Sequence, residues 1–396
     1  MDFYATWPGM GCAVAALLLV ALPPFGILDP PMRPRADHLS RLDGLRGLLA
    51  LGVFLHHAAI YHVFSTTGRW AAPPARFYRT VGPAAVAMFF MITGLLFFGK
   101  LLAEDGRPDW PRLFVGRIAR IAPLYLASVV AMLATVLGIS PHLHVPPLDL
   151  ARQVGSWLLL GFGSQPDVNG YGRTWALDAG VTWTLHYEWL FYIALLPLGL
   201  LVRFRLLSPA STILCLAACL AWAALTPDTN IPPSLPVLLS MFLAGIAAAA
   251  IRRARCPIGT GVTGSVAILL LLGLTFLCPG RYGFEPTLLL GGAFFLIAGG
   301  NTLFGLLESR PAIRLGHISF GVYLLQGQVL WTVFHLVPPS VTRSPAGFWY
   351  CVAAACLSLV LVATAAHLAI ERPGIELGRR VGTRLRSGSR TTASEA

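Results

Sequence analysis

Apolar and polar positions fall in long blocks along this chain, with apolar stretches separated by short polar loops. The stretches are about 18–23 residues long, which is the length that a helix needs to cross the hydrocarbon core of a bilayer. Because no water is available there, every backbone amide must be bonded within its own segment, so such stretches form helices. The pattern predicts an all-α, polytopic transmembrane bundle of about ten spans, at residues 44–64, 82–102, 121–139, 183–203, 209–226, 233–251, 261–278, 285–303, 317–336 and 348–370.

Two further apolar segments are ambiguous. Residues 151–163 (ARQVGSWLLLGFG) are short for a span, and we interpret them as re-entrant or interfacial. Residues 11–28 resemble the core of a signal peptide, but no basic region precedes them. If they span the membrane there are eleven helices; alternatively, Met32 is the true start. We therefore divide the chain into an N-terminal segment of open role (1–40), a transmembrane domain (41–373) and a basic, disordered cytoplasmic tail (374–396).

The distribution of charge predicts the orientation. Hydrophobic residues make up 56% of the chain and charged residues 12%, whereas about a quarter of the residues of a soluble domain are charged. Placing residues 33–43 in the cytoplasm and alternating from there assigns 21 Lys and Arg residues to the inside and 7 to the outside. This bias is typical of a multi-pass protein of the cell membrane, here with a cytoplasmic C-terminus.

The same distribution argues against nucleic acid as a partner, despite a net charge of +12. Basic residues cluster in the loops, and no basic face joins a nucleic-acid-binding motif. None of the seven cysteines forms a CxxC or a Cys/His ligand spacing, so we predict no metal site.

The first span carries the most informative polar residues, Arg46 and His57. They are eleven residues apart, which is about 20° past three full helical turns, so they share a face and lie about 16 Å apart along the axis. Taken alone, Arg46 also fits a snorkelling interfacial arginine, and His57 an interhelical hydrogen bond. Their alignment, with Asp43 one turn before Arg46, favours a functional polar stripe, because intramembrane ionisable residues usually face a polar cavity.

Two later segments offer partners for this stripe. Glu188 lies about five residues from the outer end of its predicted span, at a depth similar to that of His57, and we expect the carboxylate to orient the imidazole. Arg117 and Arg120 are three residues apart at the predicted start of another span. Such a pair can bind phosphate with help from the helix dipole. The structural alternatives are a polar contact between helices for Glu188 and topology-setting charge for the arginines.

Together these segments resemble the acyltransferase-3 family, which includes bacterial O-acetylases of surface polysaccharides and acyltransferases of macrolide antibiotics. The resemblance covers residues 41–373 and depends on RLDGLRG with Arg46 and His57, FFMITGLLF at 89–97, RIARIAPLY at 117–125, WTLHYEWLFY at 183–192, ISFGVYLLQ at 318–326 and ERP at 371–373. Many members have histidine where Gln326 stands here. We therefore expect no ionisable role at this position and interpret the segment as structural.

The resemblance implies a membrane O-acyltransferase. It implies acyl-CoA, by default acetyl-CoA, as a cytosolic donor substrate, no permanently bound cofactor, and a hydroxyl of a carbohydrate or macrolide-type molecule as acceptor. Carried over by position, Arg46 and His57 are the essential pair of the first helix, Arg117 and Arg120 the second arginine motif, and Glu188 the acidic position.

The mechanism that we predict has Arg117 and Arg120 holding the CoA phosphates, His57 acting as general base and Glu188 orienting it. Direct transfer and a covalent acyl-histidine both remain open. The alternative function is a transporter or exporter of a polysaccharide or lipid, which would use the same intramembrane residues as a pathway and consume no CoA.

Overall fold

The computed structural model describes residues 2–29, 38–226, 232–253 and 259–394. Within these ranges the chain forms helices and no strand, apart from one isolated bridge between Val168 and Tyr171. The predicted all-α fold is confirmed. The helices in chain order are α1 (Thr6–Ala21), α2 (His38–Thr67), α3 (Arg76–Ala103), α4 (Trp110–Ile139), α5 (Pro147–Trp157), α6 (Trp183–Arg203), α7 (Pro209–Leu225), α8 (Leu235–Arg253), α9 (Val262–Thr275), α10 (Phe284–Gly299), α11 (Arg310–His317), α12 (Ser319–Leu336), α13 (Pro339–Thr342), α14 (Pro345–Ala366) and α15 (Arg372–Ser394).

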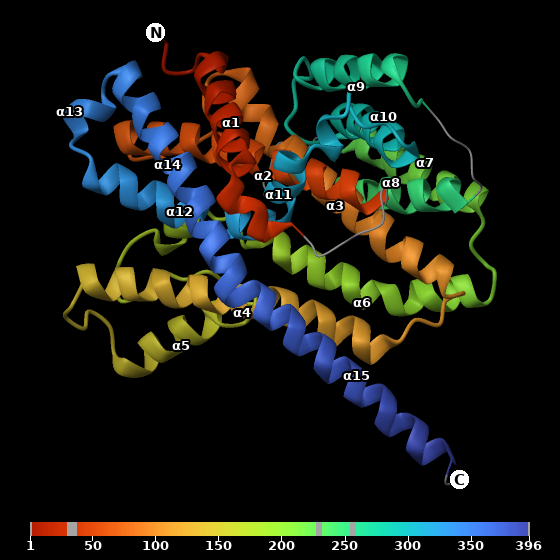
Figure 1. The fold of residues 1–396 in the computed structure, drawn as a ribbon. Helices are drawn as coiled ribbons and strands as arrows, with labels where there is room; N and C mark the ends of the chain where they lie inside the picture. Colours follow the sequence, from red (N-terminus) through yellow and green to blue (C-terminus); the bar gives the residue numbers. More distant parts are fainter. Residues whose placement is uncertain (1, 30–37, 227–231, 254–258, 395–396) are drawn as a thin grey trace.

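Every predicted span coincides with a helix of this bundle (Figure 1). Among the described residues, six helical segments are long and apolar enough to cross a membrane: α2, α3, α4, α6, α8 and the continuous α14–α15 rod. Helices α1, α7, α9 and α10 are apolar but shorter. The chain is therefore a multi-pass membrane protein, while the number of crossings, ten or eleven, stays a prediction.

Close backbone contact joins α3 to α8. A Cβ on Gly94 would lie 2.4 Å from the carbonyl oxygen of Phe242, and one on Gly245 would lie 2.0 Å from that of Met91. Only glycine permits this approach. Lipid tails are as apolar as the helices, so association in a bilayer depends on such tight packing. Thr93 beside Gly94 donates to the carbonyl of Phe89 within its own helix at 3.0 Å.

The ambiguous segment near the N-terminus is part of the bundle. Helix α1 lies beside α14 and α11, which come from the far end of the sequence (Figure 1). The buried Arg314 of α11 donates to the carbonyl of Val20 at 2.8 Å and to both carboxylate oxygens of Asp29 at 2.8 and 2.7 Å. At the other end of α1, Tyr78 donates to the carbonyl of Ala5 at 2.6 Å. The alternative start at Met32 lies outside the described residues.

The segment between α4 and α6 contains no helix long enough to cross a membrane. Its helix α5 has only 11 residues and is largely exposed on one side. The following chain turns back into the bundle as a buried 3₁₀ turn, Thr174–Asp178. Tyr61 of α2 fixes this turn by donating to the carbonyl of Ala176 at 2.5 Å. As a result, α6 begins inside the bundle and not at its surface.

The C-terminal segment differs from the disordered tail that we expected. The chain continues from α14 through one turn of π-helix, His367–Glu371, into α15, which crosses α4 and extends beyond the body (Figure 1). Gly374 and Gly378, one turn apart, face α4: a Cβ on either residue would meet Ala119 at 2.8 or 2.4 Å. These two glycines therefore allow the basic segment to pack closely against the helix that carries Arg117 and Arg120.

Candidate active site

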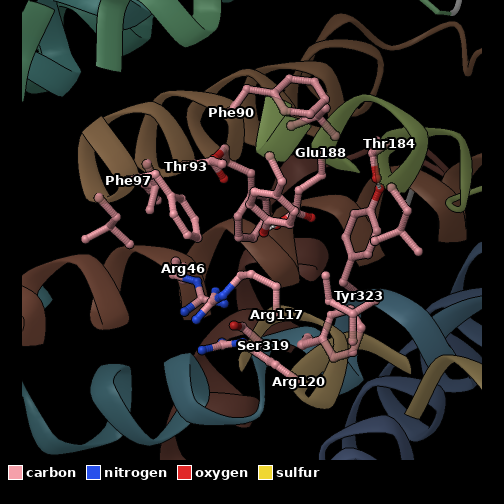
Figure 2. Close-up of a pocket in the computed structure, with 18 of the residues that line it drawn as sticks. Arg46, Phe90, Thr93, Phe97, Arg117, Arg120, Thr184, Glu188, Ser319 and Tyr323 are labelled. Atoms are coloured by element: carbon pink, nitrogen blue, oxygen red, sulfur yellow. Dashed lines mark hydrogen bonds between the residues drawn. The ribbon is translucent and has the colours of Figure 1, made fainter. Parts of the chain in front are cut away.

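A cavity of about 520 Å³ lies between α2, α3, α4, α6 and α12 (Figure 2). Its walls are largely apolar and aromatic, with Phe89, Phe90 and Phe97 from α3 and Phe320 from α12. Binding sites for organic ligands usually combine such walls with a few polar groups that fix orientation. The cavity therefore has the size and lining of a small-molecule site.

Four basic side chains line the cavity: Arg46 from α2, Lys100 from α3, and Arg117 and Arg120 from α4. Figure 2 shows the guanidinium groups of the three arginines gathered in one region, which we call the arginine end. Arg46 lies 3.7 Å from the carboxylate of Asp43, and the Arg117 guanidinium lies over the Phe97 ring at 5.0 Å from its centroid. Such a concentration of positive charge in an apolar surrounding is suited to an anionic ligand.

The arginine pair of α4 is positioned differently from the prediction. Asp109 caps the helix by accepting from the backbone N–H of Arg112 at 3.1 Å, and α4 begins at Trp110. Arg117 and Arg120 therefore lie about two turns inside the helix. The two arginines do share a face. The prediction that they lie at a helix N-terminus is wrong, because the capped helix begins well before the apolar stretch. Their own charge is what they contribute.

Glu188 of α6 also lines the cavity, and it lies nearer the arginine end than we expected (Figure 2). Its carboxylate accepts a hydrogen bond from the hydroxyl of Tyr192, one turn later on the same helix. The expected contact with His57 is not among the hydrogen bonds of the described residues. The depth estimate placed the start of α6 at the membrane surface, whereas the buried turn Thr174–Asp178 shifts that start into the bundle.

His57 has a different partner, Gln326 of α12. Its Nδ1 lies 3.3 Å from the Gln326 side-chain oxygen. Gln326 is fully buried, and its amide nitrogen donates to the carbonyl of Tyr323 at 2.8 Å. The position that we interpreted as structural therefore contacts the proposed base directly. An amide inside an apolar span is itself an uncommon feature, and this is the signal in the sequence that could have identified it.

His57 is not among the residues that line the cavity. Tyr323 and Thr184 do line it, and their hydroxyl groups are hydrogen-bonded at 2.8 Å. Tyr323 also donates to the carbonyl of Val181 at 3.1 Å. Since Gln326 lies one turn beyond Tyr323 on α12, this hydrogen-bonded wall connects the cavity to the surroundings of His57.

Aromatic rings surround His57 on the other side. The ring of Trp70 lies 6.3 Å from that of His57, and it meets Trp175 edge-on at 5.2 Å and Tyr61 at 5.2 Å. Both tryptophans are half-buried. This group could not be predicted from the sequence, because Trp70 and Trp175 are over a hundred residues apart and come together only through the buried turn Thr174–Asp178.

The structure thus brings Arg46, Arg117, Arg120 and Glu188 to one cavity and leaves His57 beyond its wall on the helix that it shares with Arg46. Lys100, Tyr323 and Gln326 join the site without having been predicted. The catalytic and binding roles assigned to all these residues stay predictions.

Comparison with known proteins identifies the family. The acyltransferase-3 family model, described as an acyltransferase domain, matches residues 39–365, which include every residue of the cavity. Comparisons with curated proteins and with solved structures give no match. Because the match extends over most of the chain, this protein belongs to the acyltransferase-3 family and is a membrane acyltransferase.

Proposed function

We propose that this protein transfers an acyl group, by default acetyl, from acyl-CoA to a hydroxyl of a carbohydrate or macrolide-type acceptor. The observation that supports this most directly is the cavity lined by four basic side chains, three of which gather at its arginine end, and by aromatic walls. CoA has two parts that match these features: a strongly anionic phosphate head, and a long, weakly polar arm that ends in the thioester.

The donor enters from the cytoplasm in this proposal. The arginine end of the cavity lies near the start of α2, and the excess of basic residues in the loops supports a cytoplasmic location of that end. Arg117, Arg120 and Arg46 hold the phosphates, with Lys100 as a further cation. The C-terminus is cytoplasmic in the same arrangement.

The reaction takes place near His57, about 16 Å along α2 from Arg46. The extended arm of CoA spans this distance and passes the wall formed by Tyr323 and Thr184. His57 accepts the proton of the acceptor hydroxyl, whose oxygen attacks the thioester carbonyl carbon. Collapse of the tetrahedral intermediate breaks the carbon–sulfur bond, and the imidazolium returns its proton to the CoA thiolate. Glu188 acts at the cavity, where it balances the charge of the arginines.

The test is to follow release of the CoA thiol by purified protein in proteoliposomes, with acetyl-CoA and a panel of sugar and macrolide acceptors. We expect thiol release that depends on an acceptor and equals the amount of acylated product. Movement of a candidate substrate across the bilayer without thiol release would contradict the proposal and support an exporter.

A further inference from the structure

Gln326 lies where it can determine which ring nitrogen of His57 carries the proton. Its side chain is fully buried in α12 and makes two hydrogen bonds at opposite ends of one amide. The nitrogen donates to the Tyr323 carbonyl at 2.8 Å, and the oxygen faces His57 Nδ1 at 3.3 Å.

The Tyr323 carbonyl fixes which way the amide points. A carbonyl oxygen can only accept, so the amide nitrogen must face it. The reversed amide would bring two acceptor oxygens together in a buried site and lose that bond. The Gln326 oxygen is therefore the atom presented to His57, and a neutral imidazole can bond it only when Nδ1 carries the proton.

We infer that Gln326 is a positioning residue that holds His57 in the Nδ1–H form, so that Nε2 is the nitrogen available to take the acceptor proton. This inference rests on the proposed function, in which His57 is the general base.

The backbone carbonyl of Val53, one turn earlier on α2, also lies within hydrogen-bonding reach of the His57 ring, and the other side chains around the ring do not compete with Gln326. The adjacent His56 meets the His57 ring edge-on at 5.1 Å, but its own Nδ1 is engaged with the carbonyl of Tyr78 at 2.5 Å. Trp70 contacts the ring from another side, and its indole can only donate. Glu188 bonds Tyr192.

A neutral amide fixes the ring without adding a charge, unlike the carboxylate that often orients a catalytic histidine. A carboxylate at this position would stabilise the protonated imidazolium and make His57 a base only at higher pH. With glutamine, the imidazole is oriented by a neutral partner, and a buried charge inside the span is avoided.

The experiment compares Gln326→Leu and Gln326→Glu with a matched control on the same helix, Gln328→Leu. Gln328 is a half-buried amide of the same helix, but it donates to the backbone and hydroxyl oxygens of Ser128 on α4 at 2.8 and 2.9 Å. Its loss removes an interhelical contact of similar strength without touching His57.

We expect Gln326→Leu to lower kcat about 3- to 10-fold, as for the loss of one neutral hydrogen bond, with KM for acyl-CoA unchanged. Gln326→Glu still accepts from Nδ1–H, so it should retain activity at high pH and move the acidic limb of the kcat–pH profile to higher pH. Gln328→Leu should leave that profile where it is in the wild type.

The tautomer itself is read from the ¹⁵N chemical shifts of His57 in histidine-labelled protein, assigned by comparison with His57→Ala. We expect a protonated Nδ1 in the wild type and in Gln326→Glu, and a changed Nδ1 shift in Gln326→Leu. If Gln326→Leu does not fold, the ¹⁵N shifts of wild-type His57 and the kcat–pH profile of Gln326→Glu still test the inference.

An unprotonated Nδ1 in the wild type, or a Gln326→Glu profile that matches the wild type, would overturn the inference while leaving His57 as the base. Full activity of a folded His57→Ala variant would instead overturn the proposed function at His57, so the two failures are distinguishable.

Discussion

Arg117 and Arg120 lie on one face of α4 and converge with Arg46 at one end of the cavity. At the scale of single residues, this convergence explains why an anionic ligand would bind here. Each charge-assisted hydrogen bond to phosphate contributes about 1.5–3 kcal/mol.

We predict that Arg117→Ala/Arg120→Ala binds acyl-CoA at least about 100-fold more weakly, because two phosphate contacts of about 1.5–3 kcal/mol each are lost. Isothermal titration calorimetry in detergent or nanodiscs measures the affinity. Arg112→Ala is the control, since Arg112 is on the same helix but does not line the cavity. Unchanged affinity in the double variant would exclude the phosphate role.

The relative position of two residues could be predicted from the sequence where one helix carries both. The shared face of Arg46 and His57 follows from the helical repeat alone, since α2 is unbroken from His38 to Thr67. The relative depth of Glu188 and His57 could not be predicted, because it depends on where each of the two helices begins. Gln326 could not be predicted as the partner of His57, because hydrogen-bond partners across helices depend on packing, which no spacing along the chain reveals.

At the scale of elements, α15 determines how α4 is held. The glycine face of α15 contacts α4 at Ala119, between the two arginines. Any displacement of α15 therefore acts on the helix segment that supplies half of the basic residues of the cavity.

Gly378→Leu should separate α15 from α4, because even a Cβ at this position would lie 2.4 Å from the Cβ of Ala119. Overpacking of this kind costs about 1–3 kcal/mol. We expect a lower melting temperature together with weaker acyl-CoA binding. Gly116→Leu, on α4 with no neighbour within 4 Å of its Cβ position, should change neither. Equal behaviour of the two variants would contradict a supporting role for α15.

Element positions could be predicted more completely than their packing. Apolar length alone located the helices, since a membrane leaves no other way to satisfy the backbone. The α4 start and the helical α15 were mispredicted because both extend past the apolar stretch, where a cap and glycine-mediated docking decide the conformation. Neither feature has a hydrophobic pattern strong enough to identify it in advance.

At the scale of the whole molecule, the segment between α4 and α6 closes the bundle over the His57 region. Asp178, in its buried turn, accepts from the backbone N–H of Gly180 at 2.8 Å through one carboxylate oxygen. The other oxygen has no hydrogen-bond partner among the described residues. Burial raises the pKa of Asp178 to about 7, far above the ordinary value for this side chain.

This shift predicts that stability falls as pH rises. The folded state binds the Asp178 proton more tightly than the unfolded state. Its contribution is therefore complete below about pH 4 and is lost as pH rises through about 7. The total change is on the order of 4 kcal/mol.

Thermal unfolding at pH 5 and pH 8 measures this effect. The wild type should melt at a lower temperature at pH 8, and Asp178→Asn, which keeps the acceptor for Gly180 and removes the titration, should show a smaller difference. An identical pH dependence in wild type and variant would show that Asp178 does not titrate in this range.

The proposed function requires His57 to carry out the chemistry of acyl transfer. The most direct test measures transfer of a radiolabelled acetyl group from acetyl-CoA by folded His57→Ala protein, with His186→Ala as control. His186 is a half-buried histidine of α6 that meets Phe162 and Tyr187 edge-on. Loss of a general base should lower turnover by about 100-fold or more, while His186→Ala should stay close to the wild type. Near-normal transfer by His57→Ala would show that His57 is not the general base.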